Sequence, residues 1–134
     1  TKAEADRNVI AWFDRHGFSR LAIAAPTVLE LRYGLEAMPA GRKRDLLESN
    51  LSEFIDVFLG GRVIAFSRTE ADACGRILAK KRTLGESLDD HLADAMIAAC
   101  ALTSDLAIAT RNDREFRNTG VRTVNPWSPK RSRA

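Results

Sequence analysis

The segment from Leu92 to Leu102 constrains the fold of this chain more than any other feature of its sequence. Every residue in it is apolar except Asp94, and the segment is long enough for about three turns of helix. A helix that is apolar on nearly all sides is buried on most of its surface, so other elements have to pack around it. The sequence therefore predicts a buried helix that contains a single carboxylate.

Short apolar segments alternate with helical patterns along the rest of the chain. A capping box at Ser67 and Glu70 and a second cap at Ser87 are predicted to start two of the helices. Because parallel strands need crossover connections and are covered on both faces, the alternation indicates an α/β fold with a mostly parallel central sheet flanked by helices. We expect strands at 21–24, 62–66, 106–110 and 121–124, and helices at 3–16, 26–38, 42–59 and 68–83, with a last helix of about 15 residues after Ser87.

Composition limits the organisation and the surroundings of the protein. A length of 134 residues with 45% hydrophobic content suits one domain, expected at residues 1–128 and followed by a short basic tail at 129–134. The net charge of +3 is only a weak hint of an anionic partner. No apolar run reaches the roughly 18 residues of a membrane span, and Cys74 and Cys100 lack the spacing of metal or redox motifs. We therefore expect a cytoplasmic protein, without membrane contact, whose cysteines are reduced core thiols.

Two carboxylates stand in apolar surroundings. An ionised Asp94 inside a buried helix is costly unless it has a cation, a hydrogen-bond cluster or a metal beside it, and the sequence leaves a functional site and a structural ion pair equally open. Glu30 lies among apolar neighbours in the first turns of the helix that follows the strand at 21–24. A favourable place near a helix N-terminus is the alternative explanation for Glu30.

A third acidic position follows the predicted strand at 106–110. Arg111, Asn112 and Asp113 come directly after that strand, where polar residues are also ordinary in a turn. The carboxyl ends of parallel strands form the ligand-binding edge of such sheets, so these residues, Glu30 and Asp94 are expected to converge. Carboxylate and amide oxygens suit Mg²⁺ or Mn²⁺, which makes a metal site the hypothesis for this edge.

Three segments carry a resemblance to a known family. They are Thr-Val-Leu-Glu-Leu-Arg-Tyr-Gly at 27–34, Ala-Asp-Ala-Met-Ile-Ala-Ala at 93–99, and a final region with Ala-Thr-Arg-Asn at 109–112 and Asn-Pro-Trp at 125–127. In order and spacing they resemble the PIN-domain nucleases, specifically the VapC and FitB type of bacterial toxin. The resemblance implies a PIN-like three-layer fold with Glu30, Asp94 and Asp113 as catalytic, metal-binding residues, and with Asn112 as a joint candidate for the last ligand position.

The start of the chain departs from this family pattern. The family begins with a central strand carrying Leu-Asp-Thr-Asn, whose aspartate is the first metal ligand, and Thr1 stands just beyond the place where that strand would end. The resemblance therefore implies that the first strand is absent from the given chain. We expect a gap in the middle of the sheet and a site that lacks one ligand.

The function that the resemblance implies is a Mg²⁺-dependent endoribonuclease, with Mn²⁺ also possible, that acts as the toxin of a type II toxin–antitoxin pair. Its partners would be RNA, an antitoxin similar to VapB or FitA, and a second copy in a homodimer. Arg32 and Arg111 are candidate RNA contacts, although solvated surface arginines look the same in sequence.

Two other interpretations stay open. The chain could be a catalytically silent module that binds an antitoxin and helps to repress a shared promoter, or an unrelated α/β domain with structural ion pairs. Trp12, Phe13 and the helix at 42–59 are read as core residues or as an interface.

Overall fold

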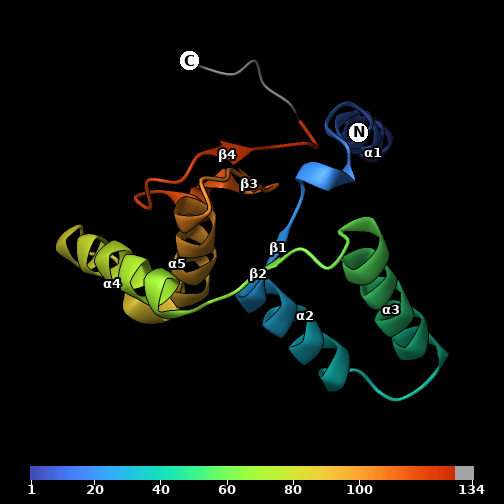
Figure 1. Ribbon diagram of the computed structural model, residues 1–134, viewed down its shortest axis with the longest axis horizontal. Coiled ribbons are helices and arrows are strands. Elements are labelled where there is room, and N and C mark those ends of the chain that lie inside the picture. The colour runs from blue at the N-terminus through green and yellow to red at the C-terminus, as the bar shows by residue number, and fades with distance from the viewer. Residues whose placement is uncertain (129–134) are drawn as a thin grey trace.

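The computed structural model describes residues 1–128, so the predicted basic tail at 129–134 lies outside the described residues. The helices form close to their predicted positions (Figure 1). The α-helices are α1 Lys2–His16, α2 Ala25–Ala37, α3 Arg42–Glu53, α4 Arg68–Thr83 and α5 Leu88–Thr103. Short helical turns are η1 Phe18–Arg20, the π-helical η2 Phe54–Phe58 that continues α3, and η3 Asp113–Phe116.

The strands are shorter than predicted and form two separate parallel pairs. β1 Ile23–Ala24 pairs with β2 Val63–Ile64, and β3 Ile108–Ala109 pairs with β4 Thr123–Val124. The α/β class with parallel strands is confirmed, but the described residues do not join the pairs into one sheet. A cavity of about 220 Å³ lies between β1 and β3 and is lined by residues of both strands.

Local signals account for the helix starts in different ways. The capping box at Ser67 is confirmed, because the Glu70 carboxylate accepts from the Ser67 backbone N–H at 3.1 Å and from its hydroxyl at 2.6 Å. Ser87 is the N-cap residue of α5, as predicted, and has an extended conformation, but its side chain makes no capping hydrogen bond. Helix α5 is therefore held by its packing against the neighbouring elements.

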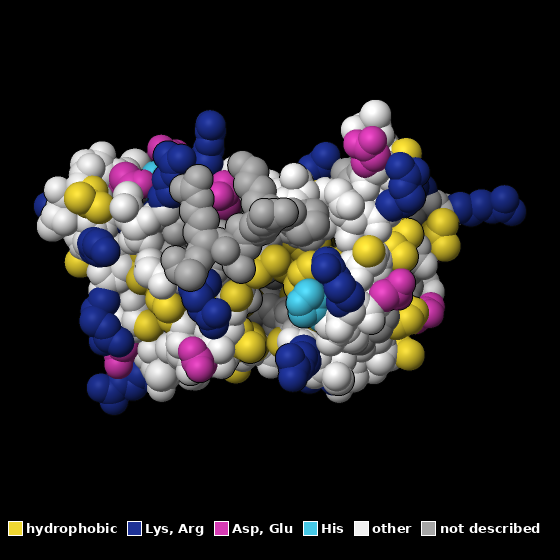
Figure 2. Space-filling view, turned by 90° about the horizontal axis from the view of Figure 1, so that it is seen from above, with side chains coloured by type: hydrophobic (Ala, Val, Ile, Leu, Met, Phe, Trp, Pro, Cys, Tyr) yellow, Lys and Arg dark blue, Asp and Glu magenta, His cyan; other side chains and the backbone are white. Residues whose placement is uncertain are grey.

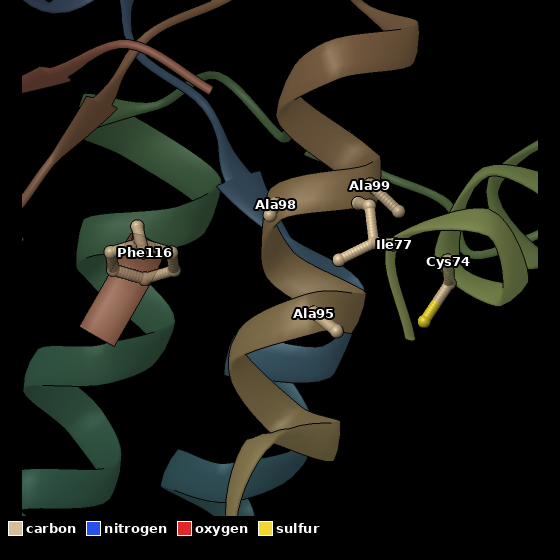
Figure 3. Close-up of a cluster of buried hydrophobic side chains, with 6 residues drawn as sticks. All are labelled: Cys74, Ile77, Ala95, Ala98, Ala99 and Phe116. Atoms are coloured by element: carbon tan, nitrogen blue, oxygen red, sulfur yellow. The ribbon is translucent and has the colours of Figure 1, made fainter. Parts of the chain in front are cut away.

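The core is built around α5. Ala95, Ala98 and Ala99 are completely buried, and their small side chains let α4 pack closely through Cys74 and Ile77 (Figure 3). Phe116 of η3 closes the cluster on another side of α5. The burial predicted for 92–102 thus holds for the middle of the segment, while Leu92 and Leu102 at its ends remain exposed.

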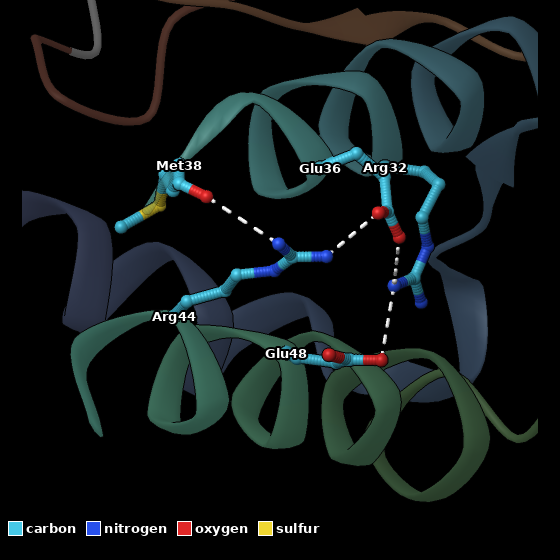
Figure 4. A network of polar contacts seen from close by, with 5 residues as sticks. All are labelled: Arg32, Glu36, Met38, Arg44 and Glu48. Carbon is cyan, nitrogen blue, oxygen red and sulfur yellow. Dashed lines mark hydrogen bonds and ion pairs between the residues drawn. The ribbon is translucent and has the colours of Figure 1, made fainter. Parts of the chain in front are cut away.

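Helices α2 and α3 extend away from this core as a hairpin (Figure 1). Four side chains and one carbonyl tie them together (Figure 4): Arg32 to Glu36 and Glu48, and Arg44 to Glu36 and the Met38 carbonyl oxygen. The apolar stripe predicted on the helix at 42–59 is only partly covered, with Leu47 and Phe58 exposed. Trp12 is 8% exposed, which makes it a core residue.

Candidate active site

Asp94 is the central acidic residue of the molecule. It lies in the second turn of α5, half-buried, one residue before the fully buried Ala95. Burial raises the pKa of the Asp94 carboxyl, and the carboxylates of Glu115 and Glu30 raise it further, with His91 and Lys81 acting in the opposite direction. Helix α2 and the turn η3 both pack against α5, so the elements that carry these three carboxylates, here called the acidic cluster, adjoin one another.

Glu30 reaches this place because α2 starts directly after β1. Ala24 is the last residue of β1 and the N-cap of α2, and the buried Pro26 stands in the first turn, where a missing N–H costs nothing. Glu30 is exposed on the following turn. Its position past the carboxyl end of a parallel strand is the one expected for a ligand-binding residue of an α/β fold.

The loop after β3 presents Glu115 to the cluster. The Thr110 hydroxyl accepts from the Asn112 backbone N–H at 3.1 Å, and the Asn112 side-chain amide donates to Glu115 Oε1 at 3.3 Å. Buried Phe116 anchors η3 immediately behind Glu115. The loop is thereby held from both sides of Glu115.

Glu115 is an acidic residue beside the predicted site that the sequence analysis did not propose. Asp113, which was proposed together with Asn112, is the first residue of η3 and is exposed, as Glu115 is. The sequence could have indicated that Asn112 and Glu115 are neighbours, because they are three residues apart and residues at that spacing lie on one face of a 3₁₀ turn.

The donor set suits a hard divalent cation. Three carboxylates and one amide can offer oxygen ligands, and burial, followed by the charges of Glu115 and Glu30, raises the pKa of Asp94. Among residues 1–128, however, no three His, Cys, Asp or Glu side chains stand close enough together to form a ready metal cluster. The residue types fit Mg²⁺, and coordination would require these side chains to draw closer.

The two arginines proposed for RNA have different surroundings. Arg32 donates to Glu48 at 3.0 Å and lies 3.7 Å from Glu36, so it is paired with carboxylates of both α2 and α3. Arg111 is exposed beside the end of β3, and its carbonyl accepts from the Asn125 side chain at 3.5 Å. Arg111 is thus the better placed of the two to meet a ligand at the acidic cluster.

The rest of the described surface does not indicate a second functional site as clearly. On the face seen in Figure 2, lysine and arginine side chains are spread over the molecule and do not gather into one stripe. Within residues 1–128, no helix combines the length and apolar character needed to cross a bilayer. The acidic cluster is therefore the feature that best locates a functional site.

Comparisons with known proteins show the family of the chain. The PIN domain family matches residues 2–121 of the chain. The chain is 38% identical over 128 residues to VapC ribonuclease Y4jK of Sinorhizobium fredii, covering 96% of this chain and 90% of that protein. It is 30% identical over 126 residues to Toxin FitB of Neisseria gonorrhoeae, covering 94% and 89%. A solved structure of FitAB bound to an IR36 DNA fragment matches with a TM-score of 0.81 and 28% identity over 94% of this chain and 87% of that chain.

Proposed function

Because this chain belongs to the PIN-domain family and is similar to VapC and FitB toxins, we propose that it is a Mg²⁺-dependent endoribonuclease, the toxin of a type II toxin–antitoxin pair. The observation that carries the proposal is that α2 and η3 both pack against α5, which brings together the elements that carry Glu30, Asp94 and Glu115. Besides burial, the charges of Glu115 and Glu30 raise the pKa of Asp94. Mutual repulsion of this kind is useful when a divalent cation binds between the groups.

The proposed ligands are the carboxylates of Glu30, Asp94 and Glu115, with Asp113 and Asn112 as further candidates beside them. When bound, Mg²⁺ or Mn²⁺ lowers the pKa of a water molecule and stabilises charge on the phosphate. Asn112 orients the Glu115 carboxylate through its amide. Arg111 is proposed to contact the RNA backbone. Arg32 instead links α2 to α3 through its ion pair with Glu48.

The proposed partner is a small antitoxin, in a complex that also contains a second copy of this chain. The similar FitAB structure contains both proteins of that pair and DNA. The apolar side chains exposed on α2 and α3, among them Leu29, Tyr33 and Leu46, supply a surface that a partner would cover. Cys74 and Cys100 are both buried and free, which supports a reducing, cytoplasmic compartment.

The test is cleavage of RNA by the purified full-length protein in Mg²⁺, in Mn²⁺ and in EDTA. We expect cleavage only with a divalent ion, and its loss in Asp94→Asn. Asp105→Asn is the matched control, because it makes the same change at an exposed residue after α5 with φ of 53°, a conformation that Asn tolerates. Metal-independent cleavage, or full activity of Asp94→Asn, would overturn the proposal. Antitoxin binding without any cleavage would favour the silent module.

A further inference from the structure

Lys81 is a buried lysine in the last turn of α4. Its side chain is 2% exposed, its Nζ donates to the Arg117 carbonyl oxygen at 3.0 Å, and Glu86 Oε1 lies 3.8 Å away. A lysine is almost never fully buried unless it is paired, because its ammonium group loses its hydration. An apolar side chain at this place would avoid that cost, so the buried ammonium needs a reason.

Glu86 joins Lys81 to several other elements. Its Oε2 accepts from the Asn118 side-chain amide at 3.3 Å, and its Oε1 lies 3.9 Å from His91 Nε2 on α5. Its backbone N–H donates to the Lys81 carbonyl oxygen at 2.9 Å. Lys81 and Glu86 therefore connect the end of α4, the start of α5 and the segment that follows η3.

That segment is the continuation of the loop that carries Glu115. Arg117 and Asn118 follow η3 directly, and the buried Thr119 donates its hydroxyl to the Phe116 carbonyl oxygen at 2.6 Å. On the other side of Glu115, the loop is held by the Asn112 amide. Lys81 is thus the contact that fixes the loop to α4 on the C-terminal side of Glu115.

We propose that Lys81 is a positioning residue that holds η3, and with it Glu115, against the helix of Asp94 by anchoring the Arg117 carbonyl oxygen. This inference rests on the proposed function only where it concerns metal binding. Lys81 itself is too buried to touch RNA, so it acts through the loop that it anchors.

A role through charge alone makes the opposite prediction. A cation near three carboxylates weakens their attraction for a divalent ion, so removing it would tighten metal binding if charge were all that mattered. Removing an anchor frees Glu115 to move away from Asp94, which weakens metal binding. The sign of the change therefore separates the two roles.

The test compares Lys81→Met with Lys80→Met, which removes the neighbouring exposed lysine of the same helix. A second variant, Lys81→Met with Glu86→Gln, also removes the negative charge of Glu86, so that no carboxylate is left without the lysine that it faces. We measure amide hydrogen exchange and Mn²⁺ affinity, the latter from the loss of the free-ion electron paramagnetic resonance signal. Both Lys81 variants should exchange faster at 113–119 and bind Mn²⁺ about tenfold more weakly, the range for groups that orient metal ligands. Lys80→Met should match the unmodified protein.

Unchanged exchange at 113–119, or tighter Mn²⁺ binding, would overturn the anchoring role. Faster exchange throughout the chain would also count against it, because that indicates general destabilisation. If the unmodified protein binds no Mn²⁺, the proposed function fails, and the exchange measurement by itself decides whether Lys81 anchors the loop.

Discussion

The side-chain amide of Asn112 donates a hydrogen bond to Glu115 Oε1 at 3.3 Å, across a single turn of η3. This contact bears on which acidic residue after β3 belongs to the candidate site. Asn112 orients the Glu115 carboxylate, which adds to the effect of burial in raising the pKa of Asp94. We therefore propose Asn112 and Glu115, three residues apart, as a pair for the last ligand position.

Glu115→Gln is expected to weaken Mn²⁺ binding and RNA cleavage more than Asp113→Asn does. The loss should exceed the tenfold typical of residues that only orient ligands, reaching about 100-fold, whereas Asp113→Asn should change little. Titration of Mn²⁺ followed by cleavage assays at saturating metal measures both. A larger loss in Asp113→Asn would restore Asp113 as the ligand.

Asp94→Asn is expected to stabilise the metal-free protein. Burial and the carboxylates of Glu115 and Glu30 raise the pKa of Asp94 in the folded state, so the unfolded chain releases that proton at a lower pH. The free energy of unfolding therefore falls as the pH rises from the unfolded pKa through the folded pKa, and the charged form is unfavourable at neutral pH. Relief of this effect should raise Tm by roughly 2–4 °C in EDTA, which corresponds to about 0.5–1 kcal/mol.

Excess Mg²⁺ provides the control for that experiment. The metal stabilises the unmodified protein by binding its folded state, so the advantage of Asp94→Asn should shrink or reverse. A lower Tm for Asp94→Asn in EDTA would show that the carboxylate has a favourable partner in the folded protein.

Ser67→Ala is expected to destabilise the protein by about 1 kcal/mol, the usual cost of a lost helix cap. The Ser67 hydroxyl and backbone N–H lower the pKa of Glu70. The stabilisation from that lowered pKa is present above the unfolded pKa of Glu70 and is lost as the pH falls through its folded pKa. Urea unfolding should thus show a smaller effect of the substitution in acid than at pH 7. Ser52→Ala, at an exposed site on α3, should be nearly neutral at both pH values.

Arg111→Gln and Arg32→Gln are expected to act on different properties. Arg111 has no ion pair within residues 1–128, so its loss should weaken RNA binding and reduce the salt slope by about 1. Arg32→Gln breaks the contacts to Glu36 and Glu48 and should cost about 0.2–1 kcal/mol of stability, with RNA binding preserved. Filter binding of RNA in EDTA at several salt concentrations, with a urea melt of each variant, separates the two. Equal losses of RNA affinity would assign Arg32 to the RNA contact as well.

The sequence by itself determined the features that depend on neighbours along the chain. Helix positions followed from apolar periodicity, and the start of α4 followed from Ser67 and Glu70, which are three residues apart. The burial of Asp94 was predictable, because the other ten of the eleven residues from Leu92 to Leu102 are apolar. The place of Glu30 after a strand was predictable in the same way.

Only the tertiary structure decided which distant groups meet. The approach of Glu115 to α5 depends on the packing of η3 against that helix, and the burial of Lys81 depends on a carbonyl 36 residues away. The separation of the strands into two pairs also depends on what packs between β1 and β3. Periodicity and capping record only interactions over three or four residues, whereas a site is made by contacts between segments whose spacing in the chain carries no such signal.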